Sequence, residues 1–356
     1  MADRREATEL DRALAVESFH FQARGCAVAG SALYAELLAR AADDLEAGGV
    51  FAELVEGFEG HPVLLVLPLR VMAAVHRLVL AGVAPALAAH YPSAGGRFEA
   101  EGAWRALLDV AHAHAPAIRA RLGSNVQTNE VRRCAALLSG FLRVAAETGL
   151  PLRVREIGSS AGLNLLFDRW RYELGPHRWG DPGAPLVLRA EWEGDPPDLD
   201  APLRVASRAG CDVDPIDVTD TEDRLRLESF VWPDQLERHM RLRDALAAAQ
   251  ADPPRLERAR AGEWVPRELA ARPAGETTVL VQSHVFWYLP EAERDGLLRD
   301  VRAAGERASA DRPIAWLRIE GTTQGEAEMR LWRWPPGEDR LLARSHPHGT
   351  WVRWEG

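Results

Sequence analysis

The chain has 356 residues, of which 47% are hydrophobic and 27% are charged, a composition typical of a globular protein with a buried core. Its formal net charge of −10, without any stripe of basic residues, argues against a nucleic-acid partner. The sequence contains no lysine, so its 43 basic residues are all arginine, which excludes Schiff-base catalysis, covalent attachment of pyridoxal phosphate and a Walker-type phosphate loop.

The cysteine, histidine and hydropathy patterns predict no disulfide framework, no metal site and no membrane anchor. The three cysteines are far apart, and the histidine pairs at positions 112 and 114 and at 346 and 348 lack a third ligand at a suitable spacing. The charged amino-terminus differs from a signal peptide, and Arg70, His76 and Arg77 interrupt the apolar segment 63–89. We expect a cytoplasmic protein with a small-molecule substrate and no membrane partner; the sequence indicates no oligomeric state.

The amino-terminal part of the chain has a helical pattern. Residues 3–148 are rich in alanine and leucine, apolar residues recur at helical spacing, and period-2 alternation is almost absent. We therefore place an all-helical cap domain at residues 1–123 and a second domain at residues 124–356.

A polar segment, residues 124–130, precedes the last helix of this part. One interpretation is a helix cap, in which Ser124 and a neighbouring polar side chain accept hydrogen bonds from the first amides. The other is that Gln127, Asn129 and Arg133 reach a ligand beside the glycine turn that follows. The two interpretations are compatible.

Residues 152–172 carry the clearest local pattern in the chain. Val154 and Ile157 fit a strand, residues 158–162 (Gly-Ser-Ser-Ala-Gly) predict a tight turn, and residues 163–172 show the apolar spacing of a helix. A strand that enters a helix through a glycine turn presents free backbone amides, which suits an anionic or nucleotide-like ligand.

Strand-like and helix-like segments alternate after the turn. Residues 171–203 are expected to form an insertion or hairpin. The later elements are predicted at residues 205–217 (strand), 220–249 (helix, capped by Thr219 or Asp220), 256–265 (strand end), 277–281 (strand), 291–304 (helix), 314–319 (strand) and 329–354 (two strands around a turn). This order predicts an α/β fold with a mostly parallel, doubly wound sheet and an antiparallel C-terminal hairpin at its edge.

Two familiar motifs match the glycine turn incompletely. The G-x-S-x-G string is that of an α/β-hydrolase nucleophile elbow, with Ser160 as nucleophile, but an elbow should follow several strands and this one follows the first. The partners of such a nucleophile occur in the right order: Asp212 or Asp217, then His284 or His346. A dinucleotide site is disfavoured, because Ser160 replaces the middle glycine and the first plausible acid after the turn is Glu191, with Asp212 the better one.

The series of strand ends over residues 125–356 resembles that of the Rossmann-like S-adenosylmethionine-dependent methyltransferases. The resemblance rests on residues 156–162 (Glu-Ile-Gly-Ser-Ser-Ala-Gly), 210–215 (Gly-Cys-Asp-Val-Asp-Pro), 262–264 (Gly-Glu-Trp) and 279–289. It implies S-adenosylmethionine as cofactor. It also implies that Asp212 holds the ribose hydroxyls, with Glu191 or Glu193 as the alternative, and that Glu263 lies at the adenine amino group.

The candidate cofactor-binding residues lie at these strand ends, at the glycine turn or in the polar segment before it. They are Gln127, Asn129, Arg133, Glu156, Gly158, Ser159, Ser160, Gly162, Asn164, Asp212, Glu263 and Gln282. His284 follows the fourth strand, where a general base would lie if the acceptor must lose a proton. Tyr288, with Trp287, could face a cationic sulfonium through its ring. His284 and Tyr288 are therefore the catalytic candidates.

More narrowly, four strings resemble a bacterial family catalogued only as a domain of unknown function, which implies no reaction: residues 127–130, 156–165, 217–220 and 346–349. We expect a methyltransferase that acts on a small molecule, with the helical cap as a lid. Three alternatives stay open. They are a serine hydrolase that uses Ser160, a non-catalytic cofactor-binding protein, and a cyclase or alkyl transferase that consumes the same cofactor on the same fold.

Overall fold

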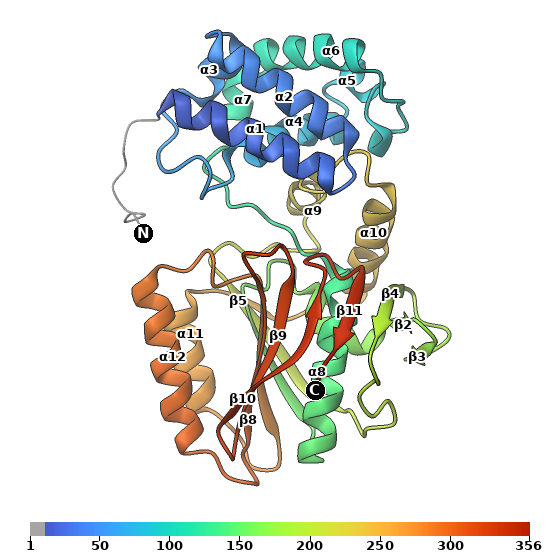
Figure 1. Cartoon of the computed structure of the whole chain (residues 1–356), viewed down its shortest axis with the longest axis vertical. Coiled ribbons are helices and arrows are strands. Elements are labelled where there is room, and N and C mark those ends of the chain that lie inside the picture. The colour runs from blue at the N-terminus through green and yellow to red at the C-terminus, as the bar shows by residue number, and fades with distance from the viewer. Residues whose placement is uncertain (1–10) are drawn as a thin grey trace. The chain divides into compact units, whose positions relative to one another are not determined.

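The computed structural model of the protein describes residues 11–356 and divides into two compact units (Figure 1). We call Met1–Thr128 with Asp220–Leu242 the helical unit, and Asn129–Thr219 with Arg243–Gly356 the sheet unit. The observed division after residue 128 differs slightly from the predicted one after residue 123. The return of residues 220–242 to the helical unit was not predicted, and it arises because side chains from that segment complete the helical core.

The helices of the helical unit share one hydrophobic core, to which Trp232 also belongs. The elements are α1 (Arg12–Val28), α2 (Ala32–Glu46), α3 (Val50–Val55), α4 (Leu67–Leu80), α5 (Pro85–Ala88), η1 (Pro92–Ala94), α6 (Ala100–Ala113), α7 (Ala115–Arg119), α9 (Thr221–Ser229) and the start of α10 (Leu236–Ala251). The prediction of helices is thus confirmed for this part of the chain; residues 3–10 of the predicted segment lie outside the described residues.

The helix predicted over residues 220–249 is divided in two. Asp220 is the N-cap of α9 and accepts a hydrogen bond from the backbone N–H of Asp223 at 2.9 Å, which decides between the two predicted caps. Pro233 lies between α9 and α10, because proline lacks an N–H and is poorly tolerated in a helix interior.

The sheet unit contains an eleven-stranded mixed sheet with the order β3-β2-β4-β11-β10-β9-β8-β7-β1-β5-β6. The strands are β1 (Leu152–Ile157), β2 (Arg171–Leu174), β3 (His177–Trp179), β4 (Val187–Glu193), β5 (Val205–Asp212), β6 (Leu256–Arg258), β7 (Thr277–Ser283), β8 (Ile314–Gly321), β9 (Ala327–Trp334), β10 (Glu338–Ser345) and β11 (Trp351–Trp354). The helical elements are η2 (Val131–Arg133), α8 (Cys134–Thr148), η3 (Leu163–Arg169), α11 (Ala261–Ala270) and α12 (Glu291–Glu306).

The position of β1 determines where a ligand can bind. It pairs in parallel with β5 on one side and with β7 on the other, so that Glu156 lies between Gly210 and Val281. After β1 the chain forms β2, β3 and β4 at the far end of the sheet. It then forms β5 and β6 on one side of β1 and returns to the other side to form β7 and β8. Such a reversal of strand order opens a crevice at the carboxyl ends of the strands, where ligands bind in open α/β sheets.

Helices cover both faces of the sheet. Gly140 lets α8 approach β8 closely, because a Cβ at this position would lie 2.8 Å from Cδ2 of Leu317. Trp316, the neighbouring residue in β8, shares a core with Trp264 and Trp334 on the face covered by α11 and α12. Figure 1 shows α11 and α12 side by side and α8 apart from them. The α/β fold with a mostly parallel sheet and antiparallel C-terminal strands is confirmed.

The C-terminal strands differ from the prediction in number and place. The tail forms three strands, β9, β10 and β11, and they lie inside the sheet rather than at its edge. The insertion predicted at residues 171–203 explains this difference. Its strand β4 pairs with β11, with Trp351 opposite Glu191, and thereby satisfies backbone groups that an edge strand would expose.

Candidate functional site

The glycine turn between β1 and η3 is tied to the neighbouring strand β5. The backbone N–H groups of Gly158 and Ser159 donate to the carbonyl oxygen of Cys211 at 2.9 and 3.0 Å, and that of Ser160 donates to Oδ2 of Asp212 at 2.9 Å. The prediction of free backbone amides is therefore wrong for these three positions, because their N–H groups already donate hydrogen bonds to residues at the end of β5. A ligand at this turn would therefore be bound by the surrounding side chains and not by these backbone amides.

The turn requires its glycines for two reasons. Gly158 has a φ of 66° and Gly162 a φ of 70°, a conformation that side chains with a Cβ rarely adopt. A Cβ on Gly158 would also lie 2.6 Å from Cγ2 of Val285. Ser160 adopts a φ of 52° despite its side chain, a backbone conformation that glycine adopts more readily.

The helix predicted after the turn is shorter than expected. Residues 163–169 form the 3₁₀ helix η3, and β2 begins at Arg171, where a continued helix was predicted. The side chain of Asn129 accepts a hydrogen bond from the backbone N–H of Leu163 at 3.0 Å, so Asn129 lies beside the turn.

Glu156, the acid before the turn, is buried, and only one of its two carboxyl oxygens has a hydrogen-bond partner among residues 11–356. Its side chain is 2% exposed, and Oε1 accepts a hydrogen bond from Nδ2 of Asn164 at 3.2 Å. Oε2 is buried without a hydrogen-bond partner among residues 11–356. Burial raises the pKa of Glu156 to about 8, although the hydrogen bond from Asn164 opposes this shift. A buried carboxyl group with a vacant acceptor is an unusual feature, which a cationic ligand group would stabilise.

The end of β7 supplies a second set of polar groups. Gln282 accepts a hydrogen bond from Nε1 of Trp316 at 3.1 Å and donates to Oε1 of Glu320 at 2.6 Å. The same Glu320 oxygen accepts the backbone N–H groups of Val285 and Phe286, both at 3.2 Å. Gln282 and Glu320 thus fix the loop after β7. Glu320 was not among the predicted site residues, although its position at a strand end was a signal that could have identified it.

His284, the first residue after β7, has a strained backbone and a buried ring nitrogen. Its φ is 57°, and Nε2 has no hydrogen-bond partner in the described part of the chain. Burial, with smaller contributions from nearby Arg133 and His348, lowers the pKa of His284 to about 3. The imidazole is therefore neutral at physiological pH.

Arg133 links these two strand ends electrostatically. Its Nε donates to the carbonyl oxygen of Pro347 at 2.9 Å. Its charge acts on Glu156, on His284 and on Glu320, whose pKa is raised, above all by burial. These interactions place Arg133 near the ends of β1 and β7, and its contact with a ligand stays a prediction.

The polar segment before α8 behaves differently from the prediction. The N-cap of η2 is Glu130, which accepts a hydrogen bond from the backbone N–H of Arg132 at 3.2 Å. The predicted cap by Ser124 is therefore wrong, because the helical segment begins seven residues later, at Val131. Gln127 is buried and belongs to the helical unit.

The order and direction of the strands separate the candidate ribose-binding acids. Asp212 ends β5, beside β1, and is part-exposed. Glu191 and Glu193 lie on β4, separated from β1 by five strands, and β4 runs opposite to β1. Glu193 instead forms an exposed ion pair with Arg353 at 2.8 Å. Asp212 is therefore the only one of the three near the glycine turn.

Glu263 does not have the position that was predicted for it, whereas the rings of Trp287 and Tyr288 are exposed. β6 ends at Arg258, and Glu263 is exposed in the first turn of α11, so it does not lie at a strand end. The buried residues of this segment, Ala261, Trp264, Val265 and Leu269, have the spacing of one helix face. Trp287 and Tyr288 are 59% and 55% exposed, so they do not pack in the core; their rings remain accessible.

The site does not have the arrangement of a hydrolase triad. The hydroxyl oxygen of Ser160 is buried and has no hydrogen-bond partner among residues 11–356, whereas a nucleophilic serine needs a histidine within hydrogen-bond reach. At the carboxyl ends of β1 and β7, four buried polar atoms instead have no hydrogen-bond partner within the described part of the chain. These atoms are Oε2 of Glu156, Oγ of Ser160, Oγ of Ser283 and Nε2 of His284.

Comparisons with known proteins identify a family but no activity. Searches of curated proteins and of solved structures give no match. Within residues 11–356, no helix is both long and apolar enough to cross a membrane. A family model described as "Uncharacterized protein conserved in bacteria (DUF2332)" matches residues 16–354, and the chain belongs to this family.

Proposed function

We propose that the sheet unit binds S-adenosylmethionine at the carboxyl ends of β1, β5 and β7, and that the protein is a methyltransferase for a small molecule. The observation that carries the proposal is the buried carboxyl group of Glu156, beside a glycine turn at the point where the strand order reverses. Its Oε2 has no hydrogen-bond partner among residues 11–356. The parallel series β6-β5-β1-β7-β8 supports a Rossmann-like arrangement.

The residues of the turn fit such a nucleoside cofactor. Oε2 of Glu156 would accept a hydrogen bond from the ammonium group of the methionine part, which removes the cost of an unpartnered buried acceptor. Asp212 is part-exposed, and each of its carboxyl oxygens accepts one backbone N–H, which leaves a lone pair on each that can accept a hydrogen bond from a ribose hydroxyl. The backbone N–H groups of Gly158 and Ser159 already donate to Cys211, which argues against a pyrophosphate at this turn.

His284 is suited to a limited catalytic role. When bound, the cofactor would supply an electrophilic methyl group. Holding the acceptor in line with that group can contribute about 7 kcal/mol or more without any proton transfer. The neutral ring of His284 would orient an acceptor hydroxyl or amine through Nε2. The exposed rings of Trp287 and Tyr288 lie on the same loop, where an aromatic face can stabilise a sulfonium.

Calorimetric titration of the full chain with S-adenosylmethionine and with S-adenosylhomocysteine tests the binding site. We expect both compounds to bind. Glu156→Gln should weaken the binding of the cationic cofactor by about tenfold or more, since a charge-assisted hydrogen bond is lost. Glu306→Gln, an exposed position at the end of α12, is the matched control and should bind as the unchanged protein does. No binding of either compound would overturn the proposal, as would equal weakening by both variants.

A further inference from the structure

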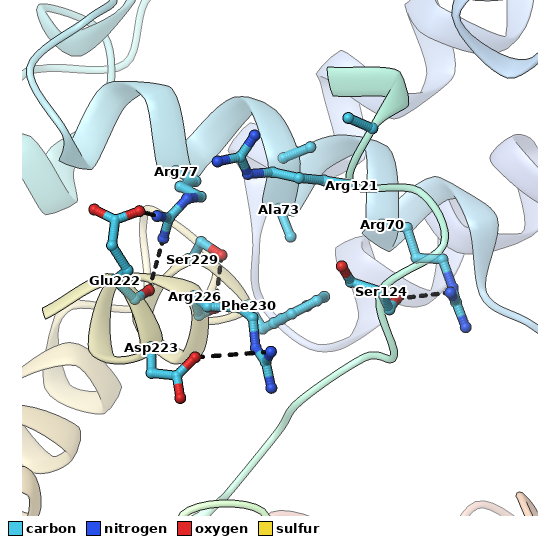
Figure 2. Close-up of a pocket in the computed structure, with 12 residues that line it drawn as sticks. Arg70, Ala73, Arg77, Arg121, Ser124, Glu222, Asp223, Arg226, Ser229 and Phe230 are labelled. Atoms are coloured by element: carbon cyan, nitrogen blue, oxygen red, sulfur yellow. Dashed lines mark hydrogen bonds and ion pairs between the residues drawn. The ribbon is translucent and has the colours of Figure 1, made fainter. Parts of the chain in front are cut away.

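The helical unit contains a cavity of about 310 Å³ whose charged side chains contact one another (Figure 2). Arg77 donates hydrogen bonds to the side chain and to the backbone carbonyl oxygen of Glu222, and Arg226 lies 3.7 Å from Asp223. These contacts point to no particular ligand. The buried carboxyl group of Glu156 in the sheet unit differs, because only one of its two oxygens has a hydrogen-bond partner among residues 11–356.

The side-chain amide of Asn164 connects Glu156 to Cys134. Its Nδ2 donates to Oε1 of Glu156 at 3.2 Å, and its Oδ1 accepts a hydrogen bond from the thiol of Cys134, with Sγ 3.4 Å away. Asn164 is 5% exposed, and Cys134 is fully buried. Asn164 was predicted to contact the cofactor. Because both polar atoms of its amide already have partners inside the protein, a role in positioning Glu156 is favoured over direct contact with a ligand.

The thiol of Cys134 fixes the orientation of this amide. Burial raises the pKa of Cys134 well above its ordinary value, so the thiol keeps the hydrogen that it donates to Oδ1 of Asn164. An amide turned the other way would direct Nδ2 at the sulfur atom, which is only a weak acceptor. The hydroxyl group of Tyr172, near the thiol, already donates to the carbonyl oxygen of Phe167 at 2.6 Å. Nδ2 of Asn164 therefore faces Glu156.

This orientation makes the two carboxyl oxygens of Glu156 unequal. Because Oε1 faces an N–H donor in both protonation states, the proton of the neutral carboxyl group lies on Oε2. Burial has the largest effect on the pKa of Glu156, and the hydrogen bond from Asn164 opposes it; the charge of Asp212 then raises the pKa, and that of Arg133 lowers it. Oε2 is thus a hydrogen-bond donor when Glu156 is protonated and an acceptor when it is ionised.

We propose that Asn164, held by the thiol of Cys134, is a positioning residue that keeps Oε1 of Glu156 on the protein's own amide and leaves Oε2 for a ligand group. A cationic group would contact Oε2 after its proton has passed to the solvent, and no other covalent bond forms or breaks. The identity of the ligand as S-adenosylmethionine rests on the proposed function. The positioning of the carboxyl group does not, because it can be measured in the unliganded protein.

Infrared spectroscopy of the unliganded full chain, across the pH range around 8, tests the proposal. The absorption of protonated carboxyl groups reports Glu156, and the part of this absorption that is missing in Glu156→Gln assigns its titration. Asn164→Ala should raise the midpoint of this titration by about one pH unit, because a hydrogen bond to the ionised carboxylate is lost. An unchanged midpoint in Asn164→Ala would overturn the proposal.

Cysteine variants separate an effect through Asn164 from a general loss of packing. In Cys134→Ala the amide can turn, so that Oδ1 of Asn164 accepts a hydrogen bond from the protonated carboxyl group; the midpoint should therefore rise, by less than in Asn164→Ala. Cys134→Ser keeps a donor and should restore the midpoint of the unchanged protein. Cys26→Ala, which removes an equally buried thiol from the helical core, is the matched control and should not change the midpoint. Equal midpoints in Cys134→Ala and Cys26→Ala, or a raised midpoint in Cys134→Ser, would overturn the proposal.

Titrations with the cofactor distinguish this proposal from the proposed function. If the midpoints shift as expected and neither S-adenosylmethionine nor S-adenosylhomocysteine binds, the proposed function fails and the positioning role of Asn164 is supported. If the cofactor binds and the midpoint in Asn164→Ala is unchanged, the positioning role alone is overturned.

Discussion

Asp212 accepts a hydrogen bond from the backbone N–H of Ser160 at 2.9 Å, so the acid that ends β5 holds the glycine turn that follows β1. The contact joins positions 52 residues apart in the chain. It places a part-exposed carboxylate beside a buried one, Glu156, at the reversal of strand order. The same contact explains how a serine is held at a φ of 52°, since the bond needs the amide of residue 160 to face β5.

Replacement of Ser160 by glycine distinguishes a structural serine from a nucleophile. Because left-handed backbone costs a residue with a Cβ about 1 kcal/mol or more, Ser160→Gly should retain cofactor binding and should not lower the free energy of unfolding. The unchanged protein should not react with a fluorophosphonate probe. Labelling that disappears in Ser160→Ala would instead support the serine hydrolase.

Gly158 should be intolerant of any side chain. Gly158→Ala adds both backbone strain and a contact with Val285 at 2.6 Å, and we expect it to lose about 2 kcal/mol or more of unfolding free energy and to abolish cofactor binding. Gly149→Ala is the matched control, since Gly149 has the same φ of 66° but no atom within 4 Å of the added Cβ. Chemical denaturation of both variants measures the difference, and equal losses would show that the contact with Val285 has no effect.

Cofactor binding should become stronger as the pH rises toward 8. With its pKa raised to about 8, Glu156 is largely protonated at pH 7, and a cationic ligand group favours its ionised form. Binding at pH 7 should therefore release a proton, which calorimetry in two buffers of different ionisation enthalpy detects. In Glu156→Gln this release should be absent; an unchanged proton release would assign it to another group.

The unliganded protein should lose stability over the same pH range. Glu156 binds its proton more tightly in the folded state than in the unfolded state, where its pKa is near 4.5, so its contribution is fully present below pH 4.5 and is lost as the pH rises through about 8. Glu156→Gln should flatten this part of the stability curve, as denaturation at several pH values would show. A curve of unchanged slope would contradict the assignment.

Glu268 should be important for the stability of the central strand. It accepts hydrogen bonds from Arg153 and Arg155 of β1 at 2.5 and 2.6 Å, and both arginines are buried. Glu268→Gln leaves two buried cations with a neutral partner and should cost about 3 kcal/mol of unfolding free energy. Glu257→Gln, which breaks the exposed pair with Arg267, should cost less than about 1 kcal/mol. Similar losses of unfolding free energy in both variants would show that burial of the ion pair does not affect its contribution to stability.

Local patterns accounted for much of the fold. The periodicity before residue 148 predicted helices, and the buried β-branched run at residues 277–281 predicted β7. Local patterns gave wrong predictions where strand pairing between distant segments decides the structure. Residues 163–172 have helical spacing, but Arg171 begins a strand because β4 offers it a parallel partner. The tail was assigned two strands at an edge, whereas β4 covers β11.

The sequence by itself determined the glycine turn, the acid before it and the acid at the end of a later strand, because turn chemistry and strand alternation are properties of neighbouring residues. Only the tertiary structure decided that Asp212, and not Glu191 or Glu193, lies beside that turn, because strand order and direction depend on pairing between distant segments. It alone also showed that Oε2 of Glu156 lacks a hydrogen-bond partner among residues 11–356, and that arginines from α4, from α9 and from the segment after α7 line one cavity. Both features arise from burial, which no local pattern encodes.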